Sequence, residues 1–346
     1  MGTATWAPAV TGGGPGDDAR GDARGDAAGG AERAGGVSAG AESVGTAPAG
    51  TAPAGTEPDG AGPVGTAPVG TAPVGTAPDG QVAPNAAPTY QVKLLVDPRR
   101  ILGADGTPLD RAATALGLGQ SSGFQVAQYM DDAELSFAGQ GWIIRFRHDG
   151  AEDRLRLTYK TRFDIVGDGT DRAAVEEALD RANAHSFDCR DTNYDPQVNI
   201  SYSRATLDFS NKKREPAPDL APGALPDPDA SRAIALDRLP GKMRKWPAKP
   251  AGWAEAVAAA PLIHGPVRQT NYPGEILGHL MEMQITPLCD ADGRESWFTE
   301  ITAKAETFGE CMRLRADLMR TLRAEGWLLE RNAFKTDLVL GRHRAR

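Results

Sequence analysis

The segment from Arg154 to Phe163 alternates between polar and apolar side chains, and this pattern constrains the fold more than any other feature of the sequence. One set of alternate positions holds Arg154, Arg156, Thr158, Lys160 and Arg162, and the other includes Leu155, Leu157, Tyr159 and Phe163. Alternate residues of a β-strand lie on opposite faces of a sheet. The segment is therefore predicted to be a strand with one basic face and one apolar face.

Several other segments carry strand signals, and two carry helix signals. Strands are predicted at 90–97, 125–130, 141–147, 198–209, 278–286, 295–304 and 337–340, in addition to 154–163. One helix is predicted over 171–184 and a second from Thr307 to Gly326, where Thr307 and Glu310 form a capping box and Gly326 ends the helix. Many antiparallel-type strands with few helices predict an α+β chain built around a β-barrel or sandwich.

The first 88 residues differ in composition from the remainder. They consist mostly of Gly, Ala, Pro and Thr, so they cannot bury enough apolar surface to offset the entropy of ordering. We expect a disordered tail at 1–88 and one folded domain at 89–346, with a Pro-rich internal loop at about 210–232. The chain carries a net charge of -8, and nine acids and three arginines precede Pro88, which leaves about -2 on the domain. A nearly neutral domain makes nucleic acid an unlikely partner.

Cysteine usage and hydropathy give expectations about the environment of the protein. Cys189, Cys289 and Cys311 are far apart and form no metal-ligand or disulfide pattern. No window approaches the run of about 20 apolar residues that a membrane helix needs, and no signal peptide is apparent. We expect a cytoplasmic protein without a membrane partner.

Basic residues share a face on more than one predicted strand. Arg145 and Arg147 alternate with Ile144 and Phe146, and Lys93 occupies a polar position of the first strand. One interpretation is a solvated outer face on which cations prevent edge strands from pairing. The other is the inside of a closed barrel, where crowded cations need an anionic guest such as polyphosphate. Repetition of the pattern in a nearly neutral domain favours the second.

The order of these elements resembles the CYTH domain of the triphosphate tunnel metalloenzyme superfamily, and the chain is similar to a divergent member. The matching pieces are Val92 to Val96, Gln128 to Asp132, Trp142 to Arg147, Leu157 to Arg162, His264 to Val267, Met281 to Met283 and Trp297 to Lys304. The resemblance implies an antiparallel, eight-stranded, tunnel-like β-barrel with flanking helices. That superfamily includes thiamine triphosphatases, inorganic triphosphatases and a class of adenylate cyclases.

The resemblance also implies roles for individual residues. Phosphate ligands would be Lys93, Arg145, Arg147, Lys160, Arg162, Arg204, Arg268 and Lys304, while Glu282 and Glu300 would be catalytic and would hold Mg²⁺ or Mn²⁺. One departure concerns the metal. The family's first strand carries two glutamates, and Thr89 and Gln91 stand in their places. Neutral oxygens do not supply the charge that draws a divalent cation into a basic cavity.

Three functions follow from this reading. The first is binding of a triphosphate-bearing small molecule or inorganic polyphosphate, with metal-dependent hydrolysis by a CYTH-type triphosphatase. The second is a non-catalytic nucleotide- or polyphosphate-binding module that has lost the first-strand glutamates. The third is a barrel that serves only as a scaffold for protein partners. Thr89 and Gln91 favour the second over the first, and the repeated basic faces disfavour the third.

Overall fold

The computed structural model describes residues 83–149, 154–217, 220–289 and 295–341. The tail predicted at 1–88 therefore lies outside the described residues except for its last six. Among the described residues, no helix is both long and apolar enough to cross a membrane.

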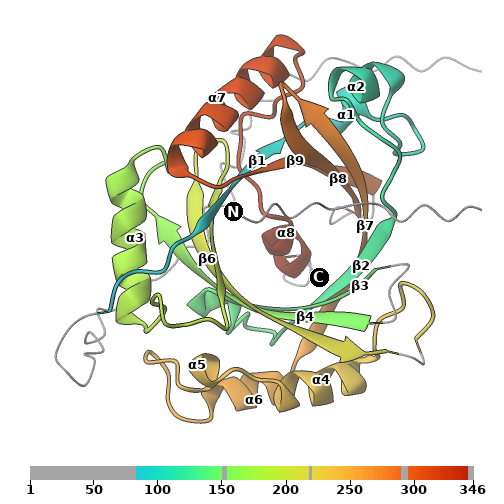
Figure 1. Cartoon of the computed structure of the whole chain (residues 1–346). Helices are drawn as coiled ribbons and strands as arrows, with labels where there is room; N and C mark the ends of the chain where they lie inside the picture. The colour runs from blue at the N-terminus through green and yellow to red at the C-terminus, as the bar shows by residue number, and fades with distance from the viewer. Residues whose placement is uncertain (1–82, 150–153, 218–219, 290–294, 342–346) are drawn as a thin grey trace, which may run out of the picture. The chain divides into compact units, whose positions relative to one another are not determined.

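Nine strands of the described residues form a closed barrel (Figure 1). They are β1 (Thr89–Leu95), β2 (Phe124–Asp131), β3 (Trp142–Asp149), β4 (Arg154–Ile165), β5 (Asp195–Ile200), β6 (Ala205–Pro216), β7 (Leu262–Ile276), β8 (His279–Cys289) and β9 (Glu295–Ala305). Their order around the barrel is β1-β5-β6-β4-β3-β2-β7-β8-β9. All neighbours pair antiparallel except β1 and β5, which are parallel. The predicted α+β class and tunnel-like barrel are confirmed, with nine strands in place of eight.

The ninth strand arises where one predicted strand is in fact two. The segment at 198–209 was expected to be a single strand, but the chain reverses at 201–204, where the Ser201 amide donates to the Arg204 carbonyl at 2.8 Å. The resulting hairpin pairs β5 with β6 from Ile200↔Ala205 onward. Only four residues separate β5 from β6, and so short a turn is not recognisable from the alternation of polar and apolar residues.

Two other elements differ from expectation. β7 was not predicted, because Pro266 and Pro273 interrupt its alternation and Pro is uncommon inside sheets. The register between β2 and β7 shifts between Ala127 and Tyr129, close to Pro266. The strand predicted at 337–340 is wrong, because these residues belong to helix α8 (Lys335–Gly341). A helix can bury the consecutive residues Val339 and Leu340 together against one surface, whereas a strand would point them to opposite faces.

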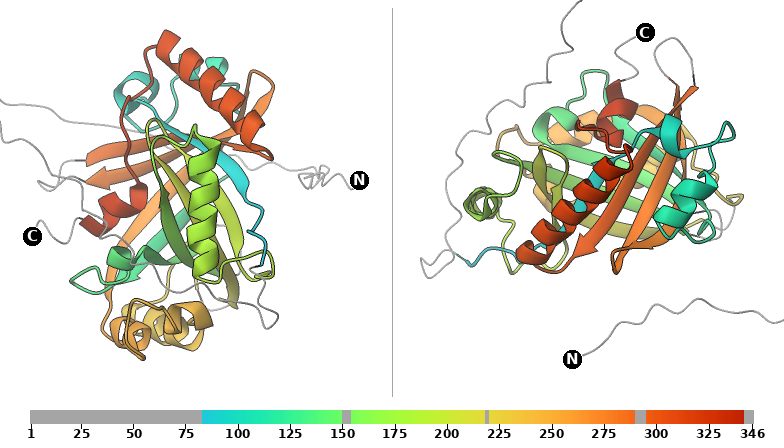
Figure 2. Two further views of the ribbon diagram at one scale, coloured as in Figure 1. Left: turned by 90° about the vertical axis from the view of Figure 1, so that its left-hand side faces the viewer. Right: turned by 90° about the horizontal axis from the view of Figure 1, so that it is seen from above.

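Helices surround the outside of the barrel (Figures 1 and 2). They are α1 (Pro98–Ile101), α2 (Asp110–Ala115), α3 (Arg172–Ala184), α4 (Pro228–Asp237), α5 (Gly241–Arg244), α6 (Trp253–Ala259) and α7 (Phe308–Ala324), with a 3-10 turn at Ala138–Gln140. Within the segment expected to be a Pro-rich loop, β6 continues to Pro216 and α4 begins at Pro228. The Thr307 hydroxyl caps α7 by accepting from the Glu310 amide at 3.2 Å, as the capping box predicts.

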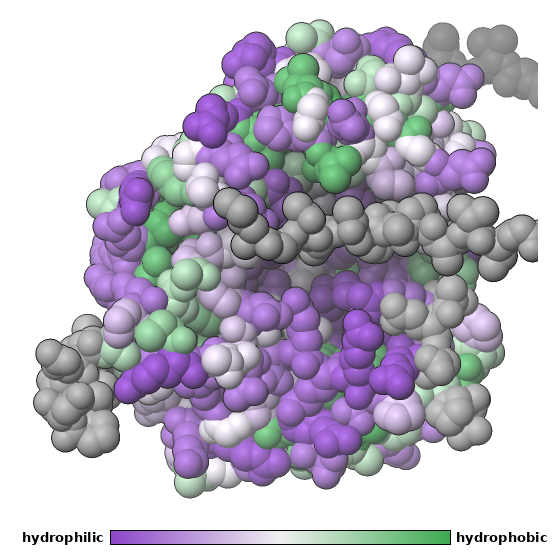
Figure 3. All heavy atoms as spheres, in the orientation of Figure 1, coloured by the Kyte–Doolittle hydropathy of each residue, from purple (hydrophilic) through white to green (hydrophobic). Residues whose placement is uncertain are grey.

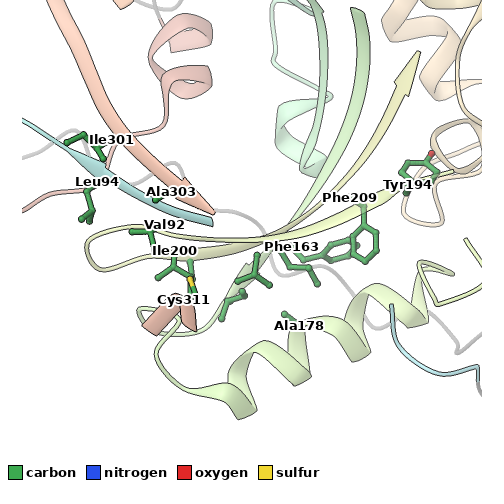
Figure 4. Packing of buried hydrophobic residues seen from close by; sticks show 14 of the residues in the cluster. Val92, Leu94, Phe163, Ala178, Tyr194, Ile200, Phe209, Ile301, Ala303 and Cys311 are labelled. Atoms are coloured by element: carbon green, nitrogen blue, oxygen red, sulfur yellow. The ribbon is translucent and has the colours of Figure 1, made fainter. Parts of the chain in front are cut away.

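The main hydrophobic core lies between the barrel and these helices. Figure 4 shows Ala178 of α3 and Cys311 of α7 facing apolar side chains of the strands, including Val92, Ile200 and Phe163. On β4, Leu155, Leu157 and Tyr159 are buried on this outer side. The apolar strand faces thus point outward beneath the helices, and the polar faces point into the barrel.

Candidate functional site

A cavity of about 1200 Å³ occupies the inside of the barrel. Its lining, counted over the described residues, contains nine basic side chains: Lys93, Arg145, Arg147, Arg156, Lys160, Arg162, Lys212, Lys304 and Lys335. It contains five acidic ones: Asp149, Asp195, Glu282, Glu300 and Glu306. Hydrophilic residues gather around the central hollow of the face shown in Figure 3. The domain is nearly neutral, yet the inside of its barrel carries an excess of positive charge.

Five of these cations form a basic wall on two neighbouring strands: Arg145 and Arg147 on β3, and Arg156, Lys160 and Arg162 on β4. Arg147 lies directly opposite Arg156, which in turn lies opposite Arg214 of β6. Like charges in this arrangement are destabilising. Burial, together with Arg145 and Arg214, lowers the pKa of Arg156, and Asp149 forms an ion pair with Arg156.

Asp208 of β6 holds the inner part of the basic wall in place. Its carboxylate accepts from Lys160 Nζ at 2.7 Å, from Arg162 Nε at 3.1 Å and from Asn199 Nδ2 at 2.9 Å. Burial opposes ionisation of this group, but Lys160 and Arg162 overcome that effect and hold the pKa of the carboxyl well below its usual value. Sequence analysis missed Asp208, although an acid between Leu207 and Phe209 was a visible signal.

Helix α8 closes one end of the cavity. Val339 and Leu340 pack with Tyr129, Leu95 and Phe298, which project from the inner faces of strands. Figure 1 shows α8 within the ring of strands. The lumen is therefore polar over most of its length and apolar where the helix seals it.

Two lysines in the cavity have lowered pKa values. Burial is the largest cause for both, and neighbouring cations add to it. The pKa of Lys160 falls to about 8, although Asp208 opposes the shift. The pKa of Lys335, on α8, falls to about 7, although Glu300 opposes it. Both lysines are thus buried close to other cations, and an anion bound beside them would raise their pKa values.

The predicted phosphate ligands divide into two groups. Lys93, Arg145, Arg147, Lys160, Arg162 and Lys304 line the cavity together. Arg204 does not line it and pairs with Asp164 at 2.7 Å. Arg268 does not line it either, because its neighbours Val267 and Gln269 take the inward positions of β7. The exposed Arg268 guanidinium instead stacks on the Phe124 ring, with its central carbon 3.8 Å from the ring centroid.

The two predicted metal ligands line the cavity on neighbouring strands. Glu282 lies on β8, and Glu300 lies on β9 opposite Gln284. One Glu282 carboxylate oxygen already accepts from Gln284 Nε2 at 2.6 Å. No group of three or more His, Cys, Asp or Glu side chains that could hold a metal ion is present among the described residues. The two carboxylates of Glu282 and Glu300 lie in a lining with nine cations, so they supply too little negative charge to hold a divalent metal ion in the empty cavity.

Several solved structures are similar to this chain. No family model and no curated protein matches the sequence. The chain is similar to a Hippeastrum candidate adenylyl cyclase described as having a dominant triphosphatase activity, at 14% identity and a TM-score of 0.44, over 72% of this chain and 94% of that one. It is also similar to a candidate adenylate cyclase from Bacillus halodurans, at 10% identity and a TM-score of 0.38, over 74% and 98%.

A protein from Pyrococcus horikoshii OT3 is similar at 13% identity and a TM-score of 0.34, over 72% of this chain and 99% of that one. In this chain, nine paired strands of the described residues define a closed β-barrel, and their inward side chains give it a basic lumen. This is the tunnel architecture implied by the resemblance to the CYTH domain.

Proposed function

We propose that the barrel binds a polyphosphate group, carried by a triphosphate-bearing small molecule or by inorganic polyphosphate. The observation that supports this most strongly is the excess of nine cations over five acids in the lining of one cavity. Crowded, partly desolvated cations destabilise the empty barrel, and an anion with several oxygens removes that cost.

The chemistry of the basic wall suits phosphate in particular. Arginine guanidinium groups bind phosphate oxygens in pairs, and lysine adds point charges. The Nε atom of Arg145 is buried and donates to no acceptor among the described residues, so it is available to a ligand oxygen. Lys93, Arg147 and Lys160 line the same cavity and could contact successive phosphates.

A single substitution tests the binding proposal. Arg145→Met should weaken binding of tripolyphosphate by about 10- to 100-fold, because one charge-assisted contact is lost. The melting temperature of the empty protein should stay the same or rise, because one repelling cation is removed. Isothermal titration calorimetry and thermal unfolding measure the two effects.

Arg268→Met is the matched control, since Arg268 lies outside the cavity lining. This variant should bind tripolyphosphate as the wild type does. Equal losses of affinity in both variants, or no binding of tripolyphosphate by the wild type, would refute the proposed site.

The donor set favours binding over metal-dependent hydrolysis. Glu282 and Glu300 must compete with the surrounding cations for any metal, and Thr89 and Gln91 add no charge. We therefore expect Mn²⁺ to bind the empty protein only weakly, at roughly millimolar concentration. Its affinity should increase when tripolyphosphate is present, because phosphates add ligands and reverse the local charge.

Calorimetric titration of Mn²⁺ checks this expectation, and the double variant Thr89→Glu, Gln91→Glu supplies a positive comparison with stronger binding. Tight Mn²⁺ binding by the empty wild type would show that the metal ligands lie elsewhere. Rapid Mg²⁺-dependent hydrolysis of tripolyphosphate that disappears in Glu282→Gln would establish the enzyme in place of the binding module.

A further inference from the structure

A groove of about 330 Å³ lies outside the barrel, between α6 and the turn that follows β2. We call it the acidic groove. Five apolar residues line it together with two acids: Ala133, Ala256, Val257, Ala260 and Leu262, with Asp132 and Glu134. Among the described residues that line the groove, none is basic. The groove therefore offers apolar surface beside two negative charges that no lining cation neutralises.

Much of this apolar surface is exposed. Leu262, the first residue of β7, is 41% exposed, and Ala256 and Ala260 are exposed as well. One Asp132 carboxylate oxygen accepts from the Ser136 amide at 2.8 Å, and this bond orients the side chain at the groove. Arginine suits such a surface, because its guanidinium pairs with carboxylates while its apolar stem covers small side chains.

Helix α8 ends at Gly341, close to the same turn. Val339 and Leu340 belong to one packed cluster with Leu135, which directly follows Glu134. The helix also contacts β7, the strand that begins with Leu262. Figure 1 shows α8 within the ring of strands and α6 outside it. A chain leaving α8 thus needs to pass only over the end of this strand pair to reach the groove.

The residues that follow α8 have the charge that the groove lacks. Residues 342–346, which we call the basic segment, read Arg-His-Arg-Ala-Arg and contain no acid. Five residues span up to about 17 Å, and neighbouring strands lie about 4.8 Å apart, so the segment is long enough. Because it is covalently attached beside the groove, its effective concentration there is on the order of millimolar or higher. Ion pairs that are individually weak then suffice for binding.

Helix α8 depends on contacts outside itself. It has seven residues, and an isolated helix of that length is not stable in water. It nevertheless places Lys335 and Thr336 in the lining of the cavity. A contact that fixes the residues after Gly341 would hold the helix from its other end.

We propose that the basic segment binds the acidic groove, with its arginines paired to Asp132 and Glu134, and thereby holds α8 in the end of the barrel. The arginine stems cover the exposed alanines and Leu262. The contact needs no ligand in the cavity, so it goes beyond the proposed function and does not depend on it.

Hydrogen exchange of the α8 amides in the empty full chain tests the proposal. Removal of residues 342–346 should accelerate their exchange about tenfold at low salt, because α8 opens more often. Glu134→Lys should have a similar effect. Combining Glu134→Lys with Arg342→Glu, Arg344→Glu and Arg346→Glu should restore slow exchange, because the pairs form again with reversed charges. High salt should reduce these differences.

Glu275→Lys is the matched control, since Glu275 is an exposed acid near the opposite end of β7 from Leu262. It should leave exchange of α8 unchanged, and melting of each variant shows that all fold. Methyl NMR locates the contact: the Ala256 and Ala260 signals should shift when residues 342–346 are removed. Unchanged exchange after that removal, unshifted alanine methyls, or no rescue by the reversed charges would each overturn the proposal. Effects that depend on protein concentration would instead place the segment on a second copy of the chain and contradict the contact within one chain.

Discussion

At the scale of single residues, one buried acid organises the cations around it. Asp208 is 1% exposed and contacts both Lys160 and Arg162. Removing one partner of a buried ion pair leaves a charge without compensation, which costs far more than an exposed pair contributes. The positions of the two basic side chains in the cavity thus depend on an acid that belongs to another strand.

Asp208→Asn should lower the free energy of unfolding by about 3 kcal/mol at neutral pH. The folded-state pKa of Asp208 lies below its usual value of 3.8, so the unfolded chain binds the proton more readily. The stabilisation is therefore present above about pH 4 and is lost as the pH falls further. The difference in the free energy of unfolding between the wild type and Asp208→Asn should become smaller as the pH falls. Urea unfolding between pH 7 and pH 3 measures this difference.

Asp195→Asn provides the control for this experiment. Asp195 pairs with Lys212 at 2.8 Å, but both side chains are largely exposed. Its replacement should change stability by at most about 1 kcal/mol at any pH. A gap between wild type and Asp208→Asn that stays constant down to pH 3 would show that ionised Asp208 does not stabilise the fold.

At the scale of elements, β4 contributes one face to the hydrophobic core and the other face to the lining of the cavity. Leu157 is fully buried against the outer helices, and the Tyr159 hydroxyl donates to the Ala235 carbonyl of α4 at 2.6 Å. The basic residues of the opposite face, Arg156, Lys160 and Arg162, line the cavity. A strand of this kind couples the packing of the helical layer to the geometry of the basic wall.

Leu157→Ala should cost about 2–5 kcal/mol of stability, because truncation leaves a cavity in a fully packed site. Leu280→Ala on β8 is the comparison, since Leu280 is 78% exposed, and it should cost less than about 0.5 kcal/mol. Chemical denaturation of the two variants checks the difference. Similar small costs for both would contradict the outward packing of the β4 apolar face.

At the scale of the whole molecule, residues just before the expected boundary of the domain also contact it. Asn85 Nδ2 donates to Asp180 at 2.6 Å, and Asn183 Nδ2 donates to the Ala83 carbonyl at 2.7 Å. The Cys189 amide donates to the Pro84 carbonyl at 3.1 Å. The residues from Ala83 to Pro88 therefore attach the start of β1 to α3 and the loop that follows it.

Two truncations locate this boundary. Removing residues 1–82 should leave the melting temperature nearly unchanged, since their composition cannot supply a core. Removing residues 1–88 should lower it by about 2–4 °C for each 1 kcal/mol of lost hydrogen bonding. Thermal unfolding of both proteins beside the full chain is the measurement. A large loss on removing only 1–82 would show that the tail contributes to the fold.

The sequence by itself determined the strands with a clear alternation, the two amphipathic helices and the identity of most cations in the cavity. Those features depend on local geometry, because alternation along a strand and the helical period are set by neighbouring residues. Lys160 and Arg162 could be assigned to one face in this way, and Thr307 could be recognised as a helix cap.

Tertiary structure alone decided which strand face points inward. The same alternation suits a solvated outer sheet, and only closure of the barrel and its covering by helices turned the basic face into a cavity. It also separated Arg145, which lines the cavity, from Arg268, which does not. Asp208 acquired its role through Lys160 and Arg162 of another strand, which are distant in sequence. Such contacts depend on register and closure, and no local pattern records them.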